Sequence, residues 1–237
     1  YQIYINDLIN ELGECNYGIC IGNINVTSPT FADDIASLAF HKYGLNKMLS
    51  IANDYRIKWQ FDFSVPKCVV MLWGKDSEPG VKLKLGPQQL EIVQSSKHMG
   101  ITLCSDKKLE QRILNKRISA AQGVVLASRG IGSYEAPVPP TILSQLYWSI
   151  GVPKMVYGLE VTPITDKHVN EIDGSHRKMA KLIQGLPVNT PIPAPLATIG
   201  WMSMKSYIAM RKIMFLWQIL YLPSTNIYRR IVCHILS

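Results

Sequence analysis

Two apolar runs enclose a pair of aspartates in the stretch Thr30-Phe31-Ala32-Asp33-Asp34-Ile35-Ala36-Ser37-Leu38-Ala39-Phe40. Because aspartate favours turns, this pattern predicts a β-hairpin with both acids at its tip. The like charges of adjacent carboxylates repel each other, and a bound cation that neutralises them stabilises the pair. The stretch therefore predicts a metal-binding turn at the edge of a buried sheet, whereas an isolated Asp-Asp pair is more often a plain surface turn or a helix N-cap.

Helical and strand-like patterns alternate irregularly on both sides of this hairpin. Apolar spacing of three and four residues predicts helices over 1–14 and 43–60. β-Branched residues over 18–26 predict one strand or a short hairpin that turns at Gly22-Asn23. Strand-like segments follow over 61–74 and, around the Gly86-Pro87 turn, over 81–103. This order lacks the steady strand–helix alternation of a doubly wound sheet, so we predict an α+β fold with an antiparallel sheet and packed helices.

The second part of the chain is helical and basic. Helical spacing covers 107–128, 141–150, 166–184 and 203–222. Residues 1–105 carry 9 Lys and Arg against 10 Asp and Glu, whereas residues 106–237 carry 16 against 7. We therefore predict two domains, 1–105 and 106–237. The excess positive charge of the second indicates a polyanionic partner as readily as a solvated, lysine-rich helical surface.

The last of these helices carries a stripe of large side chains. Tyr207, Met210, Met214, Trp217 and Tyr221 follow one another at intervals of three and four residues. Aromatic and methionine side chains in such a stripe normally face a protein core. We therefore predict that the stripe is buried and is not a ligand-binding surface.

Composition sets further limits. The 237 residues are 47% hydrophobic, enough to form a core in one or two domains. No apolar run approaches the roughly 18 residues of a membrane span, so no membrane partner is expected. Five cysteines without a Cys-x-x-Cys pair indicate reduced thiols and an intracellular location, and no targeting signal is visible. Tyr1 lies inside a helical pattern with no cap before it, which indicates a fragment of a longer protein, although proteolytic maturation would leave the same mark.

A set of motifs stands in the order found in one polymerase family. Phe31-Ala32-Asp33-Asp34 resembles the aromatic-Ala-Asp-Asp box of reverse transcriptases. The other motifs are Tyr4-Ile5-Asn6-Asp7-Leu8, Trp59, Ser64-Val65-Pro66-Lys67-Cys68, His98-Met99-Gly100-Ile101, Gly185-Leu186-Pro187, Ala194-Pro195-Leu196 and Gly200-Trp201. They resemble features of non-LTR retrotransposon reverse transcriptases. The first resembles the helix after the template-contacting motif, and the second and third together resemble the Trp…Asn-x-x-Lys-Cys motif. The fourth resembles the primer-grip entry, and the last three resemble the segment after the thumb. The resemblance spans nearly the whole chain.

This resemblance implies a fold and roles for individual residues. Residues 1–105 would be the C-terminal part of a polymerase palm, and 106–237 an all-α basic thumb with a following helical segment. Asp33 and Asp34 would be catalytic carboxylates that bind Mg²⁺, or Mn²⁺ in its place, with Asp33 as the direct ligand. Lys67 would lie near the triphosphate and protonate the leaving pyrophosphate, although an exposed lysine at the start of a strand is the alternative.

The resemblance also implies contacts with nucleic acid. His98, Met99 and Gly100 would seat the primer end, with an ordinary turn glycine as the alternative for Gly100. Five basic side chains would follow the backbone of an RNA–DNA duplex: Lys107, Lys108, Arg112, Lys116 and Arg117. The implied partners are an RNA template, a DNA primer, deoxynucleoside triphosphates and the upstream palm and fingers of the same polyprotein. The implied site of action is the nucleus.

The chain departs from the family at several points. Ser64 stands where the family has the asparagine of Asn-x-x-Lys, and His98 stands for the primer-grip aromatic residue. The family's remaining catalytic aspartate and its fingers would precede Tyr1. We therefore expect two-metal nucleotidyl transfer to a primer 3′-hydroxyl in the parent protein and no activity of this chain alone.

Two other functions remain open. One is a decayed or domesticated remnant that binds nucleic acid through 106–237 without catalysis. The other is a metal-dependent hydrolase that uses Asp33 and Asp34, for which no histidine or glutamate stands at ligand spacing.

Overall fold

The chain forms two compact units in this computed structural model, which describes residues 2–74, 82–129, 138–191 and 193–237. Unit 1 comprises Tyr1–Asp106 together with Ile219–Ser237, and unit 2 comprises Lys107–Gln218. The sequence had placed the division near residue 105 and had assigned the last segment to the second part. The prediction that Tyr1 lies inside a helical pattern concerns a residue outside the described ones.

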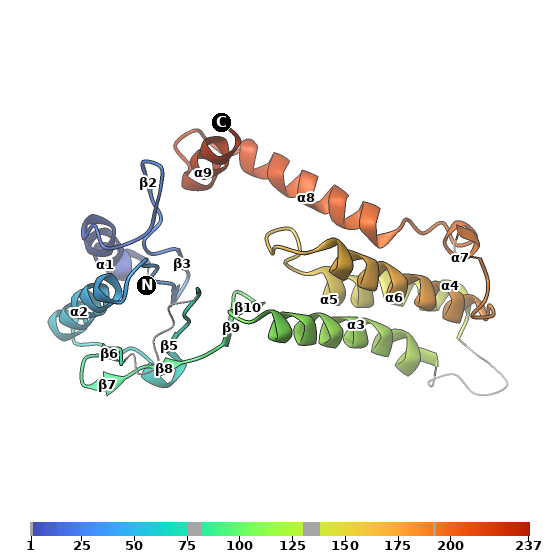
Figure 1. The fold of residues 1–237 in the computed structure, drawn as a ribbon, viewed down its shortest axis with the longest axis horizontal. Helices are drawn as coiled ribbons and strands as arrows, with labels where there is room; N and C mark the ends of the chain where they lie inside the picture. The colour runs from blue at the N-terminus through green and yellow to red at the C-terminus, as the bar shows by residue number, and fades with distance from the viewer. Residues whose placement is uncertain (1, 75–81, 130–137, 192) are drawn as a thin grey trace. The chain divides into compact units, whose positions relative to one another are not determined.

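Unit 1 contains two helices that lie side by side, α1 (Gln2–Glu14) and α2 (Lys42–Trp59), as Figure 1 shows. Leu8 of α1 packs in one buried cluster with Met48 and Tyr55 of α2. The apolar spacing that predicted each helix therefore also identified the faces that bury. Both predicted helices are confirmed.

The strands of unit 1 are short and occur in pairs. Four pairs are antiparallel: β1 (Cys20–Ile21) with β2 (Ile24–Asn25), β3 (Thr30–Phe31) with β4 (Asp34–Ile35), β6 (Lys84–Leu85) with β7 (Gln88–Gln89), and β9 (Ser95–His98) with β10 (Ile101–Cys104). The fifth pair, β5 (Val69–Val70) with β8 (Glu91–Ile92), is parallel. The predicted turns at Gly22-Asn23 and Gly86-Pro87 are confirmed.

The strand pairs do not combine into a larger sheet within the described residues. Turn-forming residues interrupt the apolar runs every few positions, so each strand ends after two to four residues. The mixed α+β character is confirmed, but the expected buried sheet behind the aspartate hairpin is replaced by isolated two-stranded ribbons that pack on helices.

Helix α2 supports two apolar clusters. The first is the cluster around Met48 and Tyr55, and the second buries Val70 with three leucines, Leu83, Leu85 and Leu90. Ala52 and Phe63 pack against both clusters. The loops and ribbons of unit 1 are therefore held by adjoining faces of one helix.

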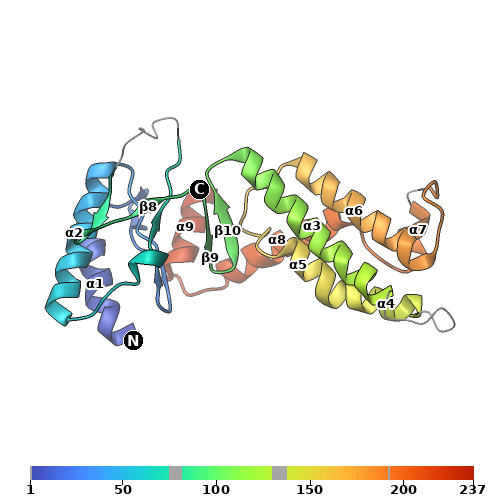
Figure 2. The same cartoon turned by 90° about the horizontal axis from the view of Figure 1, so that it is seen from below.

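Unit 2 is all-helical in the part of it that the structure describes. Its elements are α3 (Lys107–Arg129), α4 (Pro140–Leu146), the π-helical η2 (Tyr147–Gly151), α5 (Val152–Val156), α6 (Asp166–Gln184), α7 (Pro193–Ala197) and α8 (Met204–Leu220). Helix α3 packs against both α5 and α6 (Figure 2). Their shared core includes Val125, Tyr147, Met155 and Ile172. The π-helical turn directly precedes Pro153, which lacks the N–H that a regular α-helix would use there.

The exposed stripe of α8 contradicts the sequence-based expectation. Tyr207 packs against the core of unit 2, but Met210, Met214, Trp217 and Tyr221 are 39%, 54%, 62% and 78% exposed. The unit 2 core covers only the first turns of α8, through Met204 and Ile208. The spacing predicted the helix correctly, whereas the prediction that its stripe is buried is wrong.

The sequence analysis did not predict the short helices α5 and α7 or the last helix of the chain. Helix α9 (Ile227–Leu236) belongs to unit 1 and packs against β2. The ring of His234 lies 2.4 Å from where a β-carbon on Gly22 would stand, so the β1–β2 turn requires glycine for this contact. Across the described residues, no helix is both long enough and apolar enough to cross a membrane.

Candidate functional site

The two aspartates lie in the hairpin of β3 and β4. Phe31 pairs with Asp34, so the turn consists of Ala32 and Asp33. Ala32 has a φ of +54°, and a positive φ at the first turn position matches the twist that a two-residue hairpin requires. The predicted hairpin is present, but only Asp33 lies in its turn, because Asp34 already begins the returning strand.

Both carboxylates are open to solvent. Asp33 and Asp34 are exposed, and neither side chain makes a hydrogen bond or salt bridge with any residue that the structure describes. Phe31 beside them is 60% exposed, whereas Ile35 packs against the Met48–Tyr55 cluster. The hairpin is thus anchored through Ile35, and its acids are neither neutralised by a cationic side chain nor used to cap a helix.

The two carboxylates suit a Mg²⁺ site that nucleotide phosphates complete, and not a site formed by protein ligands alone. No three His, Cys, Asp or Glu side chains within the described ranges form a group that could hold a metal ion. Mg²⁺ in nucleotide-dependent enzymes binds one or two carboxylates and completes its coordination with phosphate oxygens and water. Asp33 and Asp34 match that partial donor set, and they do not form a metal cage by themselves.

Lys67 lies in a separate segment that α2 also anchors. It ends the 3-10 turn η1 (Val65–Lys67), and its N–H donates to the carbonyl oxygen of Ser64 at 2.8 Å. Its side chain is exposed, while Val65 and Cys68 pack on the cluster around Val70. This turn interrupts the segment 61–74 that the sequence analysis predicted as strand-like.

His98, Met99 and Gly100 form the end of the β9–β10 hairpin. His98 pairs with Ile101, which leaves Met99 and Gly100 as the two turn residues, with φ values of +50° and +78°. A two-residue turn with both φ values positive is one of the preferred hairpin types and favours glycine. Met99 is 46% exposed, so the expected primer-contacting residues lie at a projecting tip.

The basic side chains of α3 separate into two groups. Lys108, Arg112 and Lys116 are exposed and lie four residues apart, so they form one row along the helix, with Lys107 exposed at its start. Arg117 is half-buried and donates to the carbonyl oxygen of Tyr157 at 2.7 Å. The structure thus keeps four of the five predicted contact residues on the surface and gives Arg117 a structural bond within unit 2.

Charge divides between the units much as it divides along the sequence. Unit 1 carries 11 Lys and Arg against 11 Asp and Glu, because residues 219–237 add two arginines to it and no acid. Unit 2 carries 14 against 6, which is a net charge of +8. The whole formal charge of the protein therefore resides in the helical unit.

A buried polar cluster in unit 2 was missed by the sequence analysis. His176 is fully buried, its Nε2–H donates to the carbonyl oxygen of Met202 at 3.1 Å, and its Nδ1 accepts from the Tyr147 hydroxyl at 3.2 Å. The rings of Tyr147, His176 and Trp201 stack on one another. Burial lowers the pKa of His176 to about 4, so the ring is neutral at physiological pH.

This cluster also holds the start of α8. One carboxylate oxygen of Asp173 accepts the N–H of Met204 at 2.8 Å, and the other is 2.9 Å from Arg177. An acid at a helix N-terminus satisfies a free N–H and the helix dipole together. The cluster therefore has a structural role, and the spacing of Asp173, His176 and Ala180 along α6 was the signal that could have revealed it.

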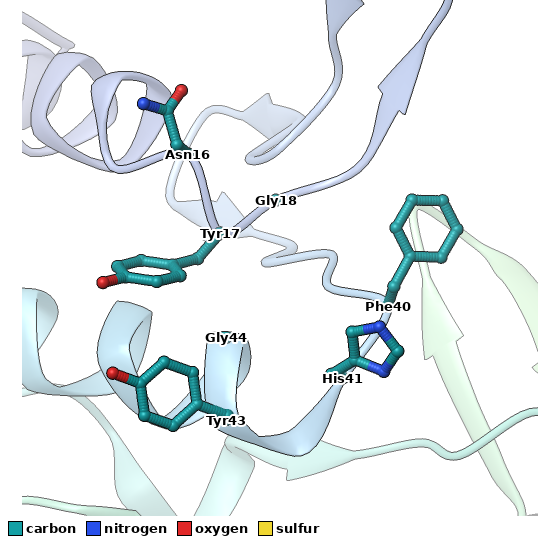
Figure 3. Close-up of a pocket in the computed structure, with 7 residues that line it drawn as sticks. All are labelled: Asn16, Tyr17, Gly18, Phe40, His41, Tyr43 and Gly44. Atoms are coloured by element: carbon teal, nitrogen blue, oxygen red, sulfur yellow. The ribbon is translucent and has the colours of Figure 1, made fainter.

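A second missed feature is a hollow of about 360 Å³ in unit 1, next to the start of α2. Figure 3 shows the residues that line it: Asn16, Tyr17, Gly18, Phe40, His41, Tyr43 and Gly44. Neither Asp33 nor Asp34 lines this hollow, so it is distinct from the aspartate hairpin.

Comparison with known proteins does not assign this chain to a family. No family model, no curated protein and no solved structure matches this chain.

Proposed function

We propose that the chain is part of an RNA-directed DNA polymerase of the non-LTR retrotransposon type. In this proposal it supplies two metal-binding carboxylates from the palm and a basic helix that binds the duplex. The observation that carries the proposal is the β3–β4 hairpin, which presents Asp33 and Asp34 to solvent without a neutralising partner among the described residues. Adjacent like charges on a tight turn are unfavourable unless a cation binds them.

The proposed reaction is the attack of a primer 3′-hydroxyl on the α-phosphate of a deoxynucleoside triphosphate, with release of pyrophosphate. Two Mg²⁺ ions, or Mn²⁺ in their place, would activate the hydroxyl and stabilise the departing pyrophosphate. Asp33 and Asp34 would be the residues of this chain that hold the metals, and Lys67 would donate a proton to the leaving group. Positioning of the reactants accounts for most of the rate, because no covalent intermediate with the protein is needed.

The nucleic-acid contacts of the proposal use both units. The tip formed by His98, Met99 and Gly100 supports the primer end, and the Lys108–Arg112–Lys116 row of α3 follows the phosphate backbone of the RNA–DNA duplex. The third metal-binding carboxylate and the fingers come from an upstream segment of the same polyprotein. The isolated chain is therefore expected to be inactive, and nuclear localisation belongs to the complete polymerase.

A second candidate function is nucleic-acid binding without catalysis. The net charge of +8 on unit 2 favours it independently of the aspartates. The reading frame upstream of Tyr1 separates the two candidates. A continuous frame with fingers and a further catalytic aspartate supports the polymerase, whereas a stop codon or an unrelated exon supports the remnant.

The metal-binding hairpin is tested by Mn²⁺ titration with NMR detection in the presence of a deoxynucleoside triphosphate. We expect the amide signals of residues 32–35 to broaden first, and the double substitution Asp33→Asn with Asp34→Asn to remove this effect. The matched control, Glu11→Gln with Glu14→Gln, removes two exposed acids from α1 and should leave the broadening unchanged. Equal broadening in the aspartate double variant would overturn the proposal.

A further inference from the structure

The hollow beside α2 has aromatic walls. The rings of Tyr17 and Tyr43 meet edge to face with centroids 5.8 Å apart, and Figure 3 shows Phe40 and His41 at the other end. Tyr17, Phe40 and Tyr43 are 38%, 69% and 63% exposed. Three exposed aromatic rings around one hollow leave apolar faces available to a planar ligand.

Two close contacts at glycines hold these walls in place. A β-carbon on Gly44 would lie 2.8 Å from the carbonyl oxygen of Tyr17, so glycine allows the first turn of α2 to approach the Tyr17 backbone closely. A β-carbon on Gly18 would overlap the side chain of Thr27, so glycine allows a close side-chain contact there. Because the walls are fixed to the start of a long helix, the hollow is formed before a ligand arrives, which lowers the entropy cost of binding.

The charges around the hollow favour an anion. No carboxylate lines it, and the first turn of α2 contains no acidic residue. Lys47 Nζ lies 5.6 Å from the centroid of the Tyr43 ring, and Lys42 stands between His41 and Tyr43 in the chain. A planar group between the rings would therefore have cationic side chains beside it.

We infer that this hollow binds one unpaired nucleobase of a single-stranded nucleic acid, with the neighbouring phosphate held by Lys42 and Lys47. Stacking of bases on aromatic rings together with backbone contacts to cations is the general means by which proteins bind single strands. The volume of about 360 Å³ is at the lower end for ligand pockets and suits one ring system. The site does not depend on the aspartate hairpin or on metal ions.

The test measures binding of fluorescein-labelled oligo(dT)₄ to the full chain by anisotropy, without divalent ions. An abasic tetramer of the same length serves as the control ligand, because it carries the phosphates without the bases. We expect oligo(dT)₄ to bind more tightly than the abasic strand, and Tyr43→Leu to weaken only oligo(dT)₄, by about ten-fold. Tyr43→Trp, which keeps an aromatic surface, should retain the affinity.

Controls separate this site from the other charged surfaces. Tyr228→Leu removes an exposed tyrosine of α9 and should not change the affinity. Lys47→Gln should weaken both ligands, whereas Asp33→Asn with Asp34→Asn should weaken neither, which distinguishes failure here from failure of the polymerase proposal. Far-UV circular dichroism verifies that each variant is folded.

Three results would overturn the inference. They are equal affinity for oligo(dT)₄ and the abasic strand, unchanged affinity in folded Tyr43→Leu, and saturable binding of a proline-rich peptide at this site without binding of oligo(dT)₄. The last result would assign the aromatic hollow to a peptide ligand instead.

Discussion

Ala32 occupies a left-handed conformation that costs a non-glycine residue about 1–2 kcal/mol. Glycine at this position would remove that cost but would lose about 0.5–1 kcal/mol through its greater freedom in the unfolded chain. We therefore expect Ala32→Gly to raise the free energy of unfolding by up to about 1 kcal/mol in urea titrations. Ala36→Gly, in the same segment but without a positive φ, should lower it by a similar amount. Destabilisation by both substitutions would contradict the prediction.

The hairpin itself was predictable, whereas the strain at its tip was not. The turn preference of aspartate was sufficient to predict a hairpin at Asp33 and Asp34, because this preference depends only on the adjacent backbone. The φ of Ala32 follows from the pairing of Phe31 with Asp34 and from the burial of Ile35, which together leave only two residues for the turn. Alanine carries no preference that would have indicated this conformation.

His176 should make the stability of the protein depend on pH. Its pKa is lowered to about 4 in the folded protein, chiefly by burial, although Asp173 and the Met202 carbonyl oppose the shift and Arg177 reinforces it. As the pH falls, His176 is therefore protonated near pH 6.5 in the unfolded chain but only near pH 4 in the folded protein. The stability that the neutral ring provides is complete above pH 6.5 and is lost as the pH falls through this window.

The size of this loss is measurable. The shift corresponds to about 3 kcal/mol, accumulated between pH 6.5 and pH 4. Urea midpoints recorded at several pH values should decline over this range in the unaltered protein. His176→Phe keeps an aromatic ring beside Tyr147 and Trp201 and should remove most of the decline. An identical decline in His176→Phe would assign the pH dependence to other groups.

At the scale of the element, the basic row on α3 should determine the affinity for an RNA–DNA duplex. Replacing Lys108, Arg112 and Lys116 with glutamine should weaken binding and reduce the salt slope of log Kd by roughly 2–3, because each lost phosphate contact releases about one ion fewer. The control replaces Lys154, Lys178 and Lys205, exposed lysines of three other helices, with glutamine. If both triple variants lose affinity equally, binding depends on total charge and not on the α3 row.

The two ends of α8 should respond differently to truncation of their side chains. Met204 is fully buried, so Met204→Ala should lower the free energy of unfolding by about 2–5 kcal/mol. Ile213 is 67% exposed, so Ile213→Ser should change it by no more than about 0.5 kcal/mol. Urea unfolding of the two variants provides the comparison. A loss above about 2 kcal/mol for Ile213→Ser would show that the side chain of Ile213 is covered in solution.

Helices were easier to predict than their surroundings. The spacing in 107–128, 166–184 and 203–222 repeats over several turns, and the corresponding helices α3, α6 and α8 are present. Periodicity identifies a side that can be buried, but it does not show how many neighbouring elements exist to cover it. The stripe of α8 is exposed for this reason: its helix is longer than the core against which its first turns pack.

At the scale of the whole molecule, chain order was a poor guide to which segments belong together. The change in composition near residue 106 lies beside the boundary between the units, because a basic helical sequence and a strand-rich one differ in every local property. Residues 219–237 instead join unit 1 through contacts such as that of His234 with Gly22. Such long-range contacts leave no local pattern in the sequence.

The separation of the neutral unit from the +8 unit predicts that metal binding and duplex binding are independent in this chain. Removing divalent ions with EDTA should leave duplex affinity unchanged, because in the proposed function the α3 row contacts phosphates directly. Asp33→Asn with Asp34→Asn should likewise leave it unchanged, or increase it slightly by removing two negative charges. The same protein should give no primer extension on an RNA template, since the described residues bring no third carboxylate to Asp33 and Asp34. Duplex binding that requires Mg²⁺ would mean that the aspartate hairpin contacts the nucleic acid. Primer extension by the isolated chain would mean that this chain suffices for catalysis.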